Sequence, residues 1–236
     1  MTMRTSDRGI AALVKHEGIV PGPYLDSVGV KTYGIGHTRN AGAPDPAELP
    51  TGMPADLDAE LARVVDVFRD DLATFEARVN KHVKVPLAQH EFDALVSFDF
   101  NTGGIYYREK ATGEWRNATL VDTLNAGNRK LAGQQFLNWK TPASIIGRRT
   151  EESELFLTGR YPTGNASVWP VDKNGKVTFK AIRTLTPAQV IELVKSPDPI
   201  PAAPDDEEDV EGYTFMPGTY RAAVDETGAL TVTILD

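Results

Sequence analysis

The chain has 236 residues, of which 41% are hydrophobic and 25% charged, as expected of a globular protein with one large domain or a domain and a small appendage. The absence of cysteine excludes disulfides, thiolate metal sites and a cysteine nucleophile, and the four histidines lack metal-ligand spacing, so no metal or cofactor is expected. The net charge of −8 is concentrated in the tail, with −2 over residues 1–160 and −6 over residues 161–236, so neither part has the basic excess of a nucleic-acid-binding protein.

The N-terminal segment predicts a short amphipathic helix. It lacks the apolar run of a signal peptide, and no stretch of the chain approaches the roughly 18 to 20 apolar residues of a membrane-spanning helix. Ser6 is a suitable N-cap, apolar residues follow at helical spacing, and Gly18 is suited to end the helix. Glu17 is therefore expected at the C-terminal end of this helix.

Residues 24–36 predict a small, sharply turning antiparallel sheet, because β-favouring Tyr, Val and Thr alternate with glycines. Asp26 follows the first strand, and Thr32 is expected on the next one. Residues 38–54 are rich in Pro, Gly and Ala, which predicts a surface loop.

The middle of the chain is predominantly helical. Asp56 is the expected cap of the longest helix, because apolar residues recur after it at spacings of three and four up to Val79. Pro86 is expected to start the next helix, which ends at Gly103 and Gly104. A polar excursion over residues 105–117 separates it from further helical patterns at about 118–126, 129–139 and 148–158.

The last part of the chain has a different character. Residues 168–182 predict a strand, a turn at Asn174 and Gly175 and a second strand, and Pro187 opens a short helix. An acidic, Pro-rich linker at about 196–211 precedes a terminal β-hairpin, and no internal repeat is found. We expect a catalytic domain over residues 1–161 and a C-terminal extension over residues 162–236.

Three side chains near the N-terminus suggest glycosidic chemistry. The predicted topology lets Glu17, Asp26 and Thr32 face one another across a cleft. Glycoside hydrolysis usually needs one protonated carboxyl to donate to the leaving oxygen and one carboxylate to activate water or to stabilise the sugar cation. The negative end of the helix dipole favours the protonated form of a terminal carboxyl, which suits Glu17 as the acid.

The segment that carries these residues, EGIVPGPYLDSVGVKTYGIGHT (17–38), closely resembles the catalytic segment of phage-type lysozymes, glycoside hydrolase family 24. The shared pattern is a Glu at a helix end, an Asp after an aromatic-bearing strand, and a Thr in a T-x-G-x-G-H sequence. Residues 89–104, 118–128, 134–139 and 147–159 resemble later helices of the family in the same order. The resemblance covers about residues 8–161.

The resemblance implies an α+β, lysozyme-like fold with a small antiparallel β-sheet lobe, a predominantly helical lobe and, here, a C-terminal β-containing extension. It also implies that Glu17 is the general acid, that Asp26 is the carboxylate that activates water or stabilises the oxocarbenium ion, and that Thr32 positions that water. It implies that Arg148 pairs with Glu17 and that His37 pairs with Asp71, as structural and electrostatic support. The implied sugar contacts are Thr38, Phe100, Asn101 and Thr119. Asn101 is alternatively a helix cap and Phe100 alternatively core, and a positive charge on Arg148 would oppose the protonation of Glu17.

The implied function is a muramidase, or endolysin, that lyses bacteria by acid/base cleavage of the β-1,4 bond between N-acetylmuramic acid and N-acetylglucosamine in peptidoglycan, with inversion. The alternatives are a non-catalytic lysozyme-fold module that binds peptidoglycan or acts as a scaffold, and a lytic transglycosylase, in which Asp26 and Thr32 would have no obvious purpose.

Peptidoglycan is the expected partner, and the protein is expected to be a monomer without a transmembrane segment. It would stay in the host cytoplasm until a holin perforates the membrane, or alternatively be associated with the virion. For residues 162–236 we favour a structural wrap over the catalytic core, with a wall-binding or partner-binding module as the alternative.

Overall fold

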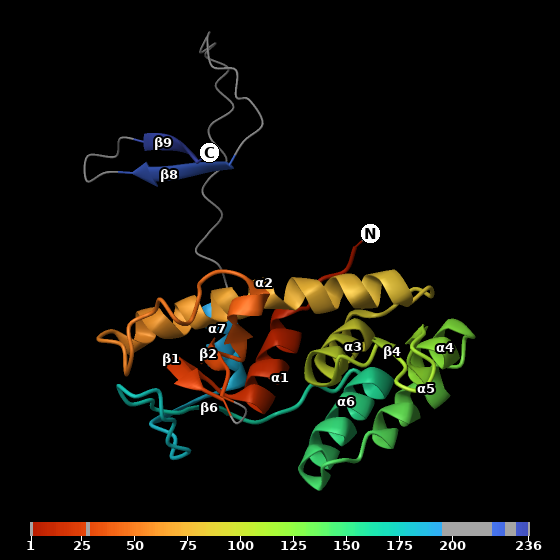
Figure 1. Ribbon diagram of the computed structural model, residues 1–236. Coiled ribbons are helices and arrows are strands. Elements are labelled where there is room, and N and C mark those ends of the chain that lie inside the picture. The colour runs from red at the N-terminus through yellow and green to blue at the C-terminus, as the bar shows by residue number, and fades with distance from the viewer. Residues whose placement is uncertain (1, 27–28, 195–218, 225–229, 236) are drawn as a thin grey trace. The chain divides into compact units, whose positions relative to one another are not determined.

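The computed structural model describes residues 2–26, 29–194, 219–224 and 230–235 (Figure 1). The chain forms two compact units, Met1–Pro197 and Asp198–Asp236. In the second unit, strands β8 (Thr219–Val224) and β9 (Leu230–Leu235) pair antiparallel, which confirms the predicted terminal hairpin. The predicted linker at about 196–211 lies outside the described residues.

The first helix forms where the sequence predicts it. Helix α1 (Asp7–Glu17) begins after Ser6, whose hydroxyl accepts from the amide of Gly9 at 3.1 Å. It ends at Gly18, which has a φ of 68° and donates its amide to Val14 at 2.8 Å. Glu17 is thus the last helical residue.

A three-stranded antiparallel sheet follows. Strands β1 (Val20–Leu25), β2 (Lys31–Gly34) and β3 (His37–Thr38) pair in that order, with Tyr24 opposite Thr32 and Thr32 opposite Thr38. This register places Thr32 in the central strand, between the two strands that flank it.

Helix α2 (Leu57–His82) connects the sheet to the helical part of the first unit (Figure 1). Asp56 caps it by accepting from the amides of Asp58 and Ala59, both at 3.0 Å. Its apolar stripe is buried at Leu61, Val64, Phe68, Leu72 and Val79, as the periodicity predicts. The α+β architecture expected from the sequence is therefore confirmed.

Further helices and a hairpin build the rest of this part. The hairpin strands occupy the predicted polar excursion, and a 3₁₀ turn, 136–138, follows α5. The elements are α3 (Gln89–Thr102), β4 (Tyr106–Arg108), β5 (Trp115–Asn117), α4 (Thr119–Asn125), α5 (Arg129–Gln135) and α6 (Ile146–Thr158).

The predicted start of helix α3 at Pro86 is wrong by three residues. The Glu91 carboxylate accepts from the amide of Ala88 at 2.8 Å, so the helix begins at Gln89. Arg129 from α5 pairs with Glu91 and also donates to the carbonyl of Pro86, which holds residues 86–88 outside the helix.

Residues 166–194 belong to the same compact unit as residues 1–161. Strand β6 (Ala166–Val168) pairs with β7 (Arg183–Leu185), and Ile19 bridges Val168 in parallel. Helix α7 (Pro187–Val194), predicted from the sequence, packs against α1 and α2 with Val190 and Val194 buried. A domain end at residue 161 stays a prediction.

The strand, turn and strand predicted for residues 168–182 are present as an irregular hairpin. Val171 and Val177 form an antiparallel bridge beside the turn, and the amide of Thr178 donates to the carbonyl of Pro170 at 3.0 Å. The regular strands lie at the far end of the arms, where Val168 of β6 pairs with Arg183 of β7.

Candidate active site

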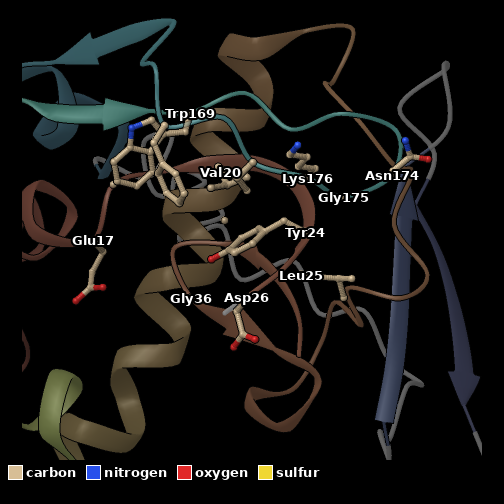
Figure 2. Close-up of a pocket in the computed structure, with 14 residues that line it drawn as sticks. Glu17, Val20, Tyr24, Leu25, Asp26, Gly36, Trp169, Asn174, Gly175 and Lys176 are labelled. Carbon is tan, nitrogen blue, oxygen red and sulfur yellow. The ribbon is translucent and has the colours of Figure 1, made fainter. Parts of the chain in front are cut away.

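Glu17 and Asp26 line one pocket of about 620 Å³, which lies between the sheet and residues 169–179 (Figure 2). Glu17 enters it from the end of α1, and its side chain is 27% exposed. Asp26 enters from the end of β1. Figure 2 shows both carboxylates on the same side of the pocket, with the hydroxyl of Tyr24 directed toward the space between them.

The turn after β1 fixes Asp26 and Thr32 relative to each other. The Asp26 carboxylate accepts from the amide of Val30 at 2.8 Å, and the Thr32 hydroxyl donates to the carbonyl of Val30 at 3.1 Å. Thr32 is only 3% exposed and is not among the residues that line the pocket, so its link to Asp26 passes through Val30.

Tyr24 was not singled out from the sequence, although it lies in the segment that carries the resemblance. Burial, together with the negative charges of Asp26 and Glu17, raises the pKa of Tyr24 to about 12. The phenol therefore stays protonated and can donate a hydrogen bond within the pocket.

Arg148 joins Glu17 to a buried network in the helical part. From the first turn of α6, its guanidinium donates to the carboxylate of Glu17, to Glu152 at 2.9 Å and to the carbonyl of Ser97 at 3.1 Å. The Ser97 hydroxyl also donates to Glu152, at 2.7 Å. The contact implied between Arg148 and Glu17 is thus present.

Glu152 is shared by two arginines. Arg149 lies 3.1 Å from it, is 1% exposed and also donates to Asn101 at 3.0 Å. Burial raises the pKa of Glu152, while the charges of Arg148 and Arg149 lower it. Burial likewise lowers the pKa of Arg149, which the charge of Glu152 opposes.

A second pocket, of about 670 Å³, opens on the other side of Glu17 and is lined by Asn101, Trp139 and Arg148 among others. Glu17 thus borders one pocket on the side of the sheet and a second on the side of the helices. This position is expected of a residue at the centre of an extended cleft.

His16 lines this second pocket and is held neutral. Burial, followed by the positive charges of Arg148, Lys15 and Arg149, lowers its pKa from 6.5 to about 3. Its Nε2 lies 3.2 Å from the Glu151 carboxylate, which also pairs with Lys15.

We expect His16→Gln to make the protein less sensitive to acid. Unfolded His16 gains a proton as the pH falls through 6.5, whereas the folded form does not until about pH 3, so the wild type loses stability over this window as the pH falls. The drop in the free energy of unfolding between pH 7 and pH 5 should be smaller by about 2 kcal/mol in the variant. Urea titrations at both pH values measure it, and an unchanged drop would contradict the assignment.

His37 joins β3 to α2. Its Nδ1 lies 2.9 Å from the Asp71 carboxylate and its Nε2 lies 2.8 Å from the carbonyl of Pro44. The pairing implied by the resemblance is present, and both ring nitrogens are engaged with groups outside the pocket.

The four positions implied in sugar contact are dispersed. Thr38 is half-buried opposite Thr32, and Asn101 is exposed at the second pocket. Phe100 is half-buried, with its ring against Phe68 and Phe75. Thr119 is exposed at the start of α4 and lines neither pocket that Glu17 lines.

Sequence reasoning missed the contribution of the extension. Residues 169–179 form one wall of the first pocket, through Trp169, Asn174, Gly175, Lys176, Val177 and Phe179. No residue pattern in this segment indicated a site, and only its packing beside β1 reveals one. Among the residues described, no cluster of three or more His, Asp or Glu side chains is placed to hold a metal ion, and no helix is long and apolar enough to cross a membrane.

Comparison with known proteins gives concordant results. The model of a family described as Phage lysozyme matches residues 14–152. The endolysin of Salmonella phage P22 is 33% identical over 160 residues, covering 66% of this chain and 99% of that protein. The endolysin of Bacillus phage PZA is 32% identical over 162 residues, covering 66% of this chain, which spans only 56% of that protein. The solved structure of an endolysin from Escherichia coli phage FAHEc1 is similar with a TM-score of 0.55 at 30% identity, covering 69% of this chain and 98% of that one.

Proposed function

The chain belongs to the phage lysozyme family of glycoside hydrolases, and we therefore propose that it is a muramidase that cleaves the β-1,4 bond between N-acetylmuramic acid and N-acetylglucosamine in peptidoglycan. The observation that carries this proposal is that Glu17 and Asp26, from two different elements, line the same pocket. Two carboxyl groups in one cleft are the chemical minimum for glycoside hydrolysis.

In this proposal Glu17 donates its proton to the leaving glycosidic oxygen. Its position between two recesses suits a group that acts at the scissile bond of a bound glycan strand. Arg148 orients the carboxyl, and Glu152 shares the positive charge of Arg148, which limits how strongly the guanidinium holds Glu17 in the ionised form.

Asp26 takes the complementary role of the general base that activates water, with inversion at the anomeric carbon. The amide of Val30 fixes one carboxylate oxygen. The Thr32 hydroxyl donates to the carbonyl of the same Val30, so it supports the turn that holds Asp26, and a direct contact of Thr32 with that water stays a prediction. Thr38, Phe100 and Asn101 would shape the sugar-binding surface, and a contact from Thr119 stays a prediction.

Product analysis tests the function. Purified peptidoglycan is digested with the wild-type protein, reduced with borohydride and examined by mass spectrometry. We expect products that end in reduced N-acetylmuramic acid. Anhydro-muramic ends would instead identify a lytic transglycosylase, and a folded protein that releases no ends from several wall types would be a binding or scaffolding module.

We further propose that the protein acts as an endolysin in bacterial lysis, since the curated relatives named above carry that name. It would act as a monomer on the wall after a holin opens the membrane, with a virion-associated lysozyme as the alternative. Lysis on co-expression with a holin, and no lysis without one, is the expected result.

A further inference from the structure

Residues 169–179 carry exposed aromatic and basic groups beside the two carboxyl groups. Phe179 is 79% exposed, and its ring centroid lies 5.4 Å from that of Trp169 at an interplanar angle of 73°. Lys176, also exposed, lines the same pocket. An aromatic side chain this exposed contributes little to the core, whereas exposed apolar surface at the rim of a cleft is typical of ligand binding.

This segment is fastened to the chain around Glu17 and Asp26 at its start and at its turn. The amide of Trp169 donates to the carbonyl of Ile19 at 2.9 Å, and the amide of Leu25 donates to the carbonyl of Gly175 at 3.2 Å. These two bonds join the segment to the first and the last part of the stretch that runs from Glu17 to Asp26.

The Trp169 ring lies directly on the backbone next to Glu17. A Cβ atom added to Gly18 would come within 2.4 Å of the ring, so only glycine permits this approach. Figure 2 shows Trp169 and Lys176 along one edge of the pocket, with Asp26 on the opposite side.

The turn that presents Lys176 is internally fixed. The Asp172 carboxylate accepts from the amides of Asn174, at 2.8 Å, and Lys176, at 3.0 Å, and Asp172 also donates its amide to the carbonyl of Lys176. A group held in this way can bind ligand with little loss of backbone entropy.

We propose that Trp169, Lys176 and Phe179 form an additional substrate subsite, in which the rings hold a sugar of the glycan strand and the Lys176 ammonium binds a carboxylate of its peptide stem. The family match ends at residue 152, so this subsite belongs to the extension. The proposal rests on the muramidase function proposed above and deepens it, because continuity with Glu17 and Asp26 makes the glycan strand the occupant.

Calorimetric titration tests the proposal. Soluble peptidoglycan fragments that carry peptide stems are titrated into the intact Glu17→Gln protein, which serves as the parent. We expect Phe179→Ala to weaken binding about fivefold. Lys176→Ala should weaken it about threefold and remove most of the dependence of the parent's affinity on NaCl concentration.

Matched controls come from the residues that follow this segment. Lys180 and Ile182 are exposed but line neither pocket, so Lys180→Ala and Ile182→Ala should bind like the parent. Equal affinities for Phe179→Ala and Ile182→Ala, or a parent that binds no fragment, would overturn the subsite. Failure of the muramidase function itself would be seen separately, as a wild-type protein that releases no reducing ends.

Discussion

Glu17→Gln is expected to reduce the release of reducing ends from peptidoglycan by about 10³-fold, the middle of the range for loss of a general acid. The amide keeps the size of the side chain and can still accept a hydrogen bond from Arg148, but it has no proton acid enough to give to the leaving oxygen. The side chain is partly exposed at the pocket, so the fold should be retained.

The measurement compares initial rates of the two proteins on the same purified walls, with circular dichroism to show that both are folded. Glu154→Gln is the matched control, because this carboxylate lies on α6, pairs only with Arg160 among the contacts described, and belongs to a side chain that is 40% exposed. Its rate should equal that of the wild type. A Glu17→Gln protein with more than a tenth of the wild-type rate would exclude Glu17 as the acid.

Glu152→Leu is expected to lower the free energy of unfolding by about 3–5 kcal/mol, because it leaves buried positive charge without its partner. Glu152 is 2% exposed and is the carboxylate that Arg148 and Arg149 share. Leucine fills much of the volume but accepts no hydrogen bond, so the Ser97 hydroxyl also loses its acceptor. Arg148 would then have Glu17 as its remaining carboxylate in the contacts described.

Urea denaturation of wild type, Glu152→Leu and Glu152→Gln gives the comparison. Glutamine still accepts from Ser97 and Arg148, so an intermediate loss is expected, whereas Glu154→Gln should change stability by less than about 0.5 kcal/mol. A loss below about 1 kcal/mol for Glu152→Leu would mean that the two arginines do not depend on this carboxylate.

The parts of the fold that were predicted correctly are those with local signals. Ser6 and Gly18 define α1 through contacts within a few residues, and Asp56 caps α2 in the same way. The start of α3 was predicted wrongly because the Glu91 carboxylate caps the amide of Ala88, and Arg129, far away in the sequence, binds both Glu91 and the carbonyl of Pro86. Contacts from a distant arginine leave no periodic pattern at the helix start.

The site residues that could be predicted are likewise those that lie in a local sequence pattern. Glu17, Asp26 and Thr32 lie within one short segment whose pattern could be compared with a family, and the contacts of Arg148 and His37 followed from that comparison. Trp169 and Phe179 reach the pocket only because β6 adds to Ile19 and carries the following loop beside β1. Long-range strand pairing of this kind is not encoded in a local motif.

The packing of α7 has a practical consequence for the engineering of chimeric lytic enzymes. Val190 and Val194 bury their side chains against the first helix and the long connecting helix, and Arg69 of the latter donates to the carbonyl of Val194. A recombination point at residue 161 would therefore uncover core surface and remove one wall of the cleft, whereas a junction after Val194 would transplant the catalytic unit whole.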